Sequence, residues 1–160
     1  MNHIPIANAS NKCSTCFLGS FCLPVGLSIE DVAKVDTLVT ERLRLNKGET
    51  LYRQGDALGA IYGVRFGTLK TQTALSNGRQ QITGFHLPGE IIGLDGISDL
   101  RQQSTALALE DSEACVIPIA DLESMARSLP SLQQQFHRIL SREISQDHNH
   151  LLFLGSMRSE

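Results

Sequence analysis

Residues 68–90 read T-L-K-T-Q-T-A-L-S-N-G-R-Q-Q-I-T-G-F-H-L-P-G-E and carry the clearest fold signal in this chain of 160 residues. Two β-rich runs, at 68–74 and 81–85, flank Asn77-Gly78, and both residues of that pair tolerate the positive φ that a tight hairpin requires. The Pro-Gly pair near the end of the stretch marks another turn. The stretch therefore predicts an antiparallel hairpin and a second reversal of the chain soon after it.

Short strand-like runs continue on both sides of this hairpin, from Leu43 to about Ile119. Further strands are expected at 50–52, 60–64 and 106–109, because these runs are rich in β-forming residues or alternate in polarity. Many short strands at this spacing predict an antiparallel roll or barrel. Glycine turns separate the runs, at Lys47-Gly48, Gln54-Gly55-Asp56, Phe66-Gly67 and Asp95-Gly96.

Helical patterns flank the predicted roll. Ser28 is suited to cap the N-terminus of a helix of roughly ten residues. A short helix is expected over 121–129, and Pro130 is suited to begin a long helix that continues from about Leu132 to Leu154. The expected organisation is a cysteine-rich arm over 1–26, a β-roll over 27–120 and the two helices over 121–160.

Composition limits the classes of function. The formal net charge is −3, and the 14 lysines and arginines are scattered, so the chain lacks the basic stripe of a nucleic-acid-binding surface. No basic and apolar leader opens the sequence, and no run of about 18 apolar residues occurs, so we expect a cytoplasmic protein without a membrane span. No Ser/His/Asp set or pair of carboxylates indicates an enzyme.

Four cysteines are spaced unevenly, with Cys13-x2-Cys16-x5-Cys22 near the start and Cys115 far downstream. Thiols stay reduced in the cytosol, so this pattern favours metal binding or redox chemistry over structural disulfides. Three interpretations are a zinc site without its second C-x2-C pair, a disulfide switch between Cys13 and Cys16, and an iron–sulfur cluster held by all four thiolates. In a fourth, Cys115 is an ordinary core residue on a strand-like run.

A cluster shared between arm and body would have a mechanical consequence. Cluster assembly would pin the arm to the body at Cys115, and cluster loss would release the arm, which suits a sensor. A dithiol redox enzyme that uses Cys13 and Cys16 is a further alternative, but no adjacent βαβ pattern supports it.

The predicted long helix carries an apolar seam with an acid inside it. The seam residues recur at intervals of 4, 3, 4 and 3, as in a coiled coil: Leu140, Ile144, Asp147, Leu151 and Leu154. In a parallel dimer two Asp147 side chains would approach each other, and like charge and desolvation would oppose association. Alternatively, the helix packs on its own domain and Asp147 finds a partner there. The first interpretation predicts a marginal dimer that a distant ligand can tip.

Several motifs link these features along nearly the whole chain. They are Cys13-x2-Cys16-x5-Cys22-Leu23-Pro24, Lys47-Gly48-Glu49-x2-Tyr52-x2-Gly55-Asp56, Gln81-Ile82-Thr83-Gly84-Phe85-His86-Leu87-Pro88-Gly89-Glu90-x2-Gly93, Ala108-Leu109-Glu110 leading to Cys115-x2-Pro118, and Ser141-x-Glu143-Ile144 with Asp147. Together they resemble the oxygen-sensing FNR/ANR branch of the cyclic-AMP receptor protein (CRP/FNR) superfamily of transcription regulators.

The resemblance implies a fold, a cofactor and a mechanism. The fold is an antiparallel double-stranded β-helix, the jelly roll of cyclic-nucleotide-binding domains. The cofactor is a [4Fe-4S] cluster, ligated by Cys13, Cys16, Cys22 and Cys115, that holds the regulator as a DNA-binding homodimer without oxygen. Oxygen converts the cluster to a [2Fe-2S] form, and the dimer dissociates. Family members continue into a C-terminal helix-turn-helix domain that is absent from this sequence, so we expect the sensor and dimerisation part alone.

The resemblance also implies roles for individual residues and partners. Ile144 and Asp147 govern dimerisation, and the full-length regulator binds DNA and RNA polymerase. Positions that match polymerase contacts, for which a solvated turn is the alternative, are Ser76, Asn77, Gly78, Arg79 and the exposed acids Glu110, Asp111 and Glu113.

One departure concerns nucleotides. Nucleotide binders of the superfamily hold the cyclic phosphate with the arginine of an Arg-Ser/Thr-Ala motif. Here Gln103-Ser104-Thr105 stands at that place, and Arg101 lies two residues early. No cyclic nucleotide is therefore expected, and the alternative is a nucleotide-gated regulator of the same fold with a zinc- or disulfide-stabilised arm.

Overall fold

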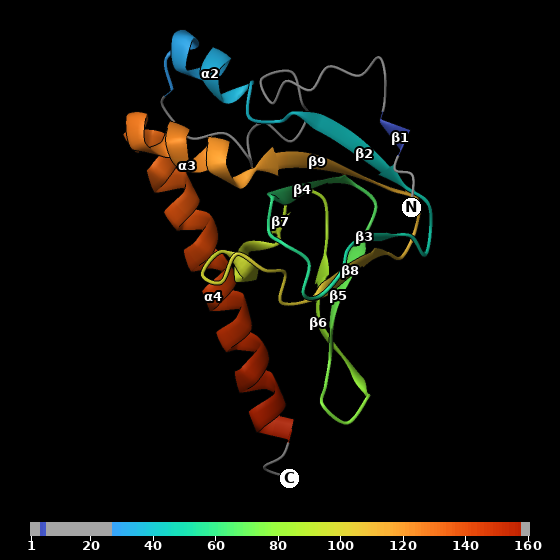
Figure 1. The fold of residues 1–160 in the computed structure, drawn as a ribbon. Coiled ribbons are helices and arrows are strands. Elements are labelled where there is room, and N and C mark those ends of the chain that lie inside the picture. The colour runs from blue at the N-terminus through green and yellow to red at the C-terminus, as the bar shows by residue number, and fades with distance from the viewer. Residues whose placement is uncertain (1–3, 6–26, 158–160) are drawn as a thin grey trace.

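Two antiparallel sheets lie face to face in the computed structural model, which describes residues 4–5 and 27–157 (Figure 1). The first sheet has the strand order β1-β2-β9-β4-β7, made of β1 (Ile4–Pro5), β2 (Glu41–Leu45), β9 (Ser112–Pro118), β4 (Ala60–Phe66) and β7 (Ile91–Ile92). The second has the order β3-β8-β5-β6, made of β3 (Thr50–Tyr52), β8 (Thr105–Ala108), β5 (Leu69–Ala74) and β6 (Gln80–His86). This jelly roll confirms the predicted mainly β fold.

The main core fills the space between the two sheets. Alternation along each strand turns one set of side chains inward, and these come from both sheets. On β9, for example, Ala114 and Val116 are buried in this core, and on β5 Leu69 is fully buried. The opposite set on β9, which includes Cys115, therefore lies on the outer face of the five-stranded sheet.

The predicted hairpin forms between β5 and β6, whose register runs from Leu69 opposite His86 to Ala74 opposite Gln80. The two residues that predicted the hairpin, Asn77 and Gly78, differ in backbone conformation. Gly78 adopts a positive φ of 79°, whereas Asn77 does not and instead accepts a hydrogen bond from the Arg79 amide through its side-chain oxygen, at 3.0 Å. β5 ends at Ala74 and β6 begins at Gln80, so the turn between them is longer than a two-residue loop.

Helices pack against one end and one side of the roll: α2 (Ile29–Val35), the 3-10 turn η2 (Leu94–Gly96), α3 (Ile119–Ser128) and α4 (Pro130–Met157). The start of α2 is as predicted, since the Ser28 side chain accepts a hydrogen bond from the Asp31 amide at 3.1 Å, but the helix has only 7 residues. A second core joins the helices to the roll and includes Val35, Leu38, Ile61, Ile119, Leu122 and Leu132.

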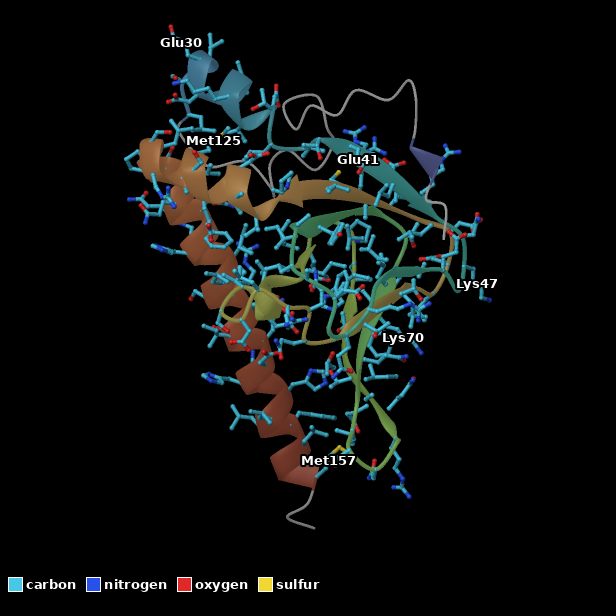
Figure 2. All side chains as sticks on the ribbon, in the orientation of Figure 1. Glu30, Glu41, Lys47, Lys70, Met125 and Met157 are labelled. Atoms are coloured by element: carbon cyan, nitrogen blue, oxygen red, sulfur yellow. The ribbon has the colours of Figure 1, made fainter. Side chains whose placement is uncertain are left out.

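The long helix α4 is buried only near its start, where Leu132 and Gln135 are covered. Its 28 residues run past the roll, and its C-terminal part lies beyond the sheets on the same side as the β5–β6 hairpin (Figure 1). Figure 2 shows Met157 at this far end and Met125 of α3 at the other. Large apolar side chains are exposed along this part of α4, namely Ile144, Leu151, Leu152, Phe153, Leu154 and Met157.

Candidate functional site

Cys115 lies in the middle of β9, between β2 on one side and β4 on the other. Its neighbours in the strand, Ala114 and Val116, point into the main core, so the Cys115 side chain points to the outer face of the sheet, where it is half-buried. The structure therefore does not support the interpretation of Cys115 as a residue of the core between the sheets.

The two residues directly opposite Cys115 shape its surroundings. On β4 it faces Gly63, which has no side chain, and a Cβ placed there would lie 3.8 Å from the Cys115 Cβ and 3.5 Å from the Ile91 Cδ1. On β2 it faces Arg42, which is only 5% exposed. Glycine inside a strand often marks the close approach of another group. Cys115 thus has a glycine without a side chain on one side, with Ile91 close by, and a buried guanidinium on the other.

A carboxylate and a second arginine extend this group on the outer face. Glu113, two residues before Cys115, accepts a hydrogen bond from Arg65 Nη1 at 2.8 Å, and the same oxygen lies 4.0 Å from Arg42 Nε. Its side chain is 12% exposed. The expectation of an exposed Glu113 is therefore wrong, because the acid is held between two strands by an arginine from β4.

The other three predicted ligands, Cys13, Cys16 and Cys22, lie outside the described residues. Within residues 4–5 and 27–157, no three His, Cys, Asp or Glu side chains gather closely enough to bind a metal ion. The residues around Cys115 do fit a sulfur-rich anionic group in two respects. Gly63 places no side chain of its own beside Cys115, and Arg42 Nε is buried without a hydrogen-bond partner among the described residues.

The predicted seam residues lie along one stripe of α4. Leu140 is half-buried against the second core, whereas Ile144, Leu151 and Leu154 are 56%, 66% and 54% exposed. Asp147 is also exposed, and it forms no ion pair within the described part of the chain. Exposed apolar stripes of this kind are typical of interaction surfaces.

A cavity of about 270 Å³ lies between the roll and α4. Polar groups from both parts line it, and three of them are carboxylic acids: Asp95, Glu143 and Asp147. His86 faces the same space, with its Nε2 atom 3.0 Å from the Thr71 hydroxyl, which in turn is 2.9 Å from the Thr83 hydroxyl. No lysine or arginine of the described chain lines this cavity.

Burial controls the protonation of these groups. Desolvation raises the pKa of Glu143, and the negative charges of Asp147, Glu90 and Asp95 raise it further. Desolvation also raises the pKa of Asp95, although its own backbone hydrogen bond opposes the change. It lowers the pKa of His86 against the attraction of nearby acids, so the ring favours its neutral form.

We expect the Glu143→Gln variant to be more stable than the wild type at pH 7.5 and to lose this advantage as the pH falls towards 5. The raised folded-state pKa of Glu143 means that the ionised side chain destabilises the fold above that pKa, and the cost vanishes below the unfolded-state value. Thermal unfolding of the air-exposed protein measures the difference, expected to be a few degrees. A matched exposed variant, Glu123→Gln, should show no such pH dependence. An equal gain in both variants would contradict the argument.

The position that matches the phosphate-binding arginine lies outside the cavity. Gln103 is exposed at the end of the second sheet, and its side-chain amide donates to the Arg101 carbonyl at 3.1 Å. Arg101 points away to the neighbouring turn, where its Nη1 donates to the Gly55 carbonyl at 3.0 Å. Neither residue lines the cavity, so its walls offer no cation to a phosphate.

The suggested polymerase contacts fall in two turns. Ser76, Asn77, Gly78 and Arg79 form the exposed tip of the β5–β6 hairpin. Glu110 and Asp111 are exposed in the turn before β9, where each already has a partner: Glu110 accepts from the Thr68 hydroxyl at 2.8 Å, and Asp111 accepts from the Lys47 amide at 3.0 Å. The turn with Glu110 and Asp111 joins β8 of the second sheet to β9 of the first, whereas the hairpin tip extends away from the body (Figure 1).

Comparisons with known proteins show which family the chain matches. Residues 42–128 match the family of the cyclic nucleotide-binding domain. The chain is 53% identical over 157 residues to the transcriptional regulatory protein btr of Bordetella pertussis, which covers 98% of this chain and 65% of the relative. It is 41% identical over 154 residues to the transcriptional activator protein Anr of Pseudomonas protegens, covering 96% of this chain and 63% of the relative. The chain thus spans less than two thirds of the length of these relatives.

Solved structures share the fold. A cyclic nucleotide-binding domain from Methylobacillus flagellatus superimposes with a TM-score of 0.75 at 15% identity, over 93% of this chain and 87% of that one. FixK2 from Bradyrhizobium japonicum gives a TM-score of 0.65 at 27% identity, over 71% of this chain and 57% of that one.

Across the described residues, no helix has the length and apolar character needed to cross a bilayer.

Proposed function

This chain belongs to the cyclic nucleotide-binding domain family, and we propose that it is the sensory and dimerisation part of an oxygen-responsive transcriptional regulator of the CRP/FNR type. The proposed parts are a cluster-binding arm over 1–26, a β-roll over 27–120 and the helices over 121–160. In the full-length regulator the partners are a second copy of the chain, DNA and RNA polymerase. The proposed location is the cytoplasm, and the proposed role is regulatory rather than enzymatic.

The proposed cofactor is a [4Fe-4S] cluster held by Cys13, Cys16, Cys22 and Cys115. When bound, it supplies the oxygen-sensitive chemistry. The observation that carries this proposal is the position of Cys115, which projects from the outer face of the sheet beside a glycine and a buried arginine instead of packing in the core. A ligand on the rigid β9 ties the state of the arm to the body of the domain.

Dimerisation is the proposed output. Ile144, Leu151 and Leu154 offer an apolar surface on α4, and Asp147 interrupts it with a charge that has no ion-pair partner in the described chain. Two such helices would gain from apolar burial and lose from the opposed carboxylates. Association is then close to balance, so a modest contribution from the cluster decides it.

Anaerobic purification, visible absorption and analysis of iron and sulfide test the cofactor. We expect a coloured protein with the full iron and sulfide content of one [4Fe-4S] cluster per chain, which air bleaches. Stoichiometric zinc in a colourless protein would overturn the proposal. It would favour the alternative regulator with a zinc-stabilised arm.

We further expect cyclic nucleotides to leave the protein unaffected. The cavity presents three carboxylic acids and no cation, so it repels the phosphate of cyclic AMP or cyclic GMP. Thermal unfolding with saturating nucleotide should match unfolding without it, since only a ligand that binds the folded state raises the melting temperature. A dose-dependent rise would favour the nucleotide-gated alternative.

A further inference from the structure

Arg42 on β2 is a buried cation with little to compensate its charge. It is 5% exposed, and its Nε atom is buried without a hydrogen-bond partner among the described residues. Its one described ion-pair contact, Nε to Glu113 Oε1, is 4.0 Å long, beyond hydrogen-bond distance. An arginine in this state costs free energy unless another anion compensates it.

Glu113 does not supply the full compensation. The oxygen that Arg42 approaches already accepts a hydrogen bond from Arg65 Nη1 at 2.8 Å, so two arginines share one carboxylate. Exposed Arg44 lies opposite Glu113 in the same ladder and adds a further positive charge to this face. The outer face beside Cys115 is thus positively charged.

The ladder places this cation at the thiol. Arg42 is directly opposite Cys115, and directly opposite residues of an antiparallel pair have side chains on the same face. On the other side of Cys115, Gly63 contributes no side chain, and Ile91 Cδ1 lies 3.5 Å from the place that a Cβ there would take. A cluster ligated by four thiolates carries net negative charge, and its potential depends on that charge and on hydrogen bonds to its sulfur atoms.

We propose that Arg42 is a positioning residue of the cluster site: its buried guanidinium balances the negative charge of the bound cluster, and its Nε–H donates to a sulfur atom there. This inference rests on the proposed [4Fe-4S] function and assigns Arg42 a role in it. Arg65 keeps Glu113 when Arg42 engages the cluster, because their hydrogen bond is the shorter contact. Arg42 therefore tunes the cluster, whereas Arg65 holds the carboxylate.

The test compares Arg42→Met with Arg44→Met in the full chain, each loaded anaerobically with iron and sulfide. Both variants remove one positive charge from the same face of β2, but Arg44 is exposed and Arg42 is buried. We expect Arg42→Met to lower the midpoint potential of the cluster and to weaken iron retention against a chelator by about tenfold or more, as loss of an outer-shell partner does. Arg44→Met should change the potential and the retention much less, because solvent screens the charge of an exposed side chain.

The outcomes separate this inference from the proposed function. A wild-type chain that takes up no cluster overturns both. A loaded wild type together with an Arg42→Met cluster of unchanged potential and retention overturns the role of Arg42 alone. If Arg42→Met fails to fold, Arg42→Lys decides the matter, since it keeps the charge without the Nε donor. A shifted potential in Arg42→Lys supports the hydrogen bond from Nε, and a wild-type potential overturns that hydrogen bond.

Discussion

Replacing Cys115 with serine is expected to abolish the [4Fe-4S] cluster as completely as replacing Cys16 with serine. A cluster of this type needs four thiolates, and a serine hydroxyl remains protonated at neutral pH and binds iron weakly in comparison. Anaerobically purified Cys115→Ser protein should therefore contain almost no iron or sulfide and show no visible absorption. The measurement is the metal and sulfide content per chain, compared between the two variants and the wild type.

The position of Cys115 also explains why the Cys115→Ser variant should fold. Cys115 is half-buried on the outer face of the sheet, so its replacement leaves the core between the sheets unchanged. Thermal unfolding of the cluster-free wild type and Cys115→Ser proteins should nearly coincide, with a difference within about 1 kcal/mol. An intact cluster in Cys115→Ser would show that Cys115 is not a ligand. In that case Cys115 would contribute only to the packing of β9.

Local patterns predicted the elements of the fold well where the signal lay within a few residues. β3 coincides with its prediction at Thr50–Tyr52, and α4 begins at Pro130, as the missing amide of proline predicts. The bounds were less accurate where tertiary contacts decide them. α2 ends after 7 residues because the chain turns at Asp36 to send Leu38 into the second core.

The surroundings of the candidate site were beyond the reach of sequence patterns. Along β2 the alternation of Arg42, Leu43 and Arg44 predicts two outward, solvated arginines, yet only Arg44 is exposed. Pairing of β2 with β9, two strands far apart in the chain, decides that Arg42 meets Cys115. Gly63 inside a strand was an available signal for a close approach, but its partner could not be identified without the register.

The Asp147→Ala variant is expected to remain a dimer in air, where the wild type is monomeric. In a parallel dimer the two Asp147 carboxylates meet within the apolar seam, and their repulsion and desolvation oppose association. Alanine removes both costs and leaves Ile144, Leu151 and Leu154 free to pack. The expected gain is about 1–3 kcal/mol, or roughly 5- to 150-fold in the dimerisation constant. Sedimentation velocity of the air-exposed proteins over a range of concentrations measures it.

Asp147 differs from a surface acid in its setting, and this makes the prediction specific. It lines the acidic cavity, where its negative charge raises the pKa of Glu143 one turn earlier on α4. The carboxylate therefore opposes a like charge within its own chain as well as across the proposed seam. The Asp147→Asn variant should also dimerise in air because it removes the charge and keeps the size.

Two controls distinguish charge at the seam from a general effect of replacing a helix residue. Gln146→Ala changes an exposed neighbour on α4 outside the seam and should leave the protein monomeric in air. Adding Ile144→Asp to Asp147→Ala restores a buried like charge at the seam and should dissociate the dimer again. An air-exposed Asp147→Ala protein that sediments as a monomer at every concentration would rule out repulsion at Asp147 as the switch. The cluster would then have to act on dimerisation through contacts outside α4.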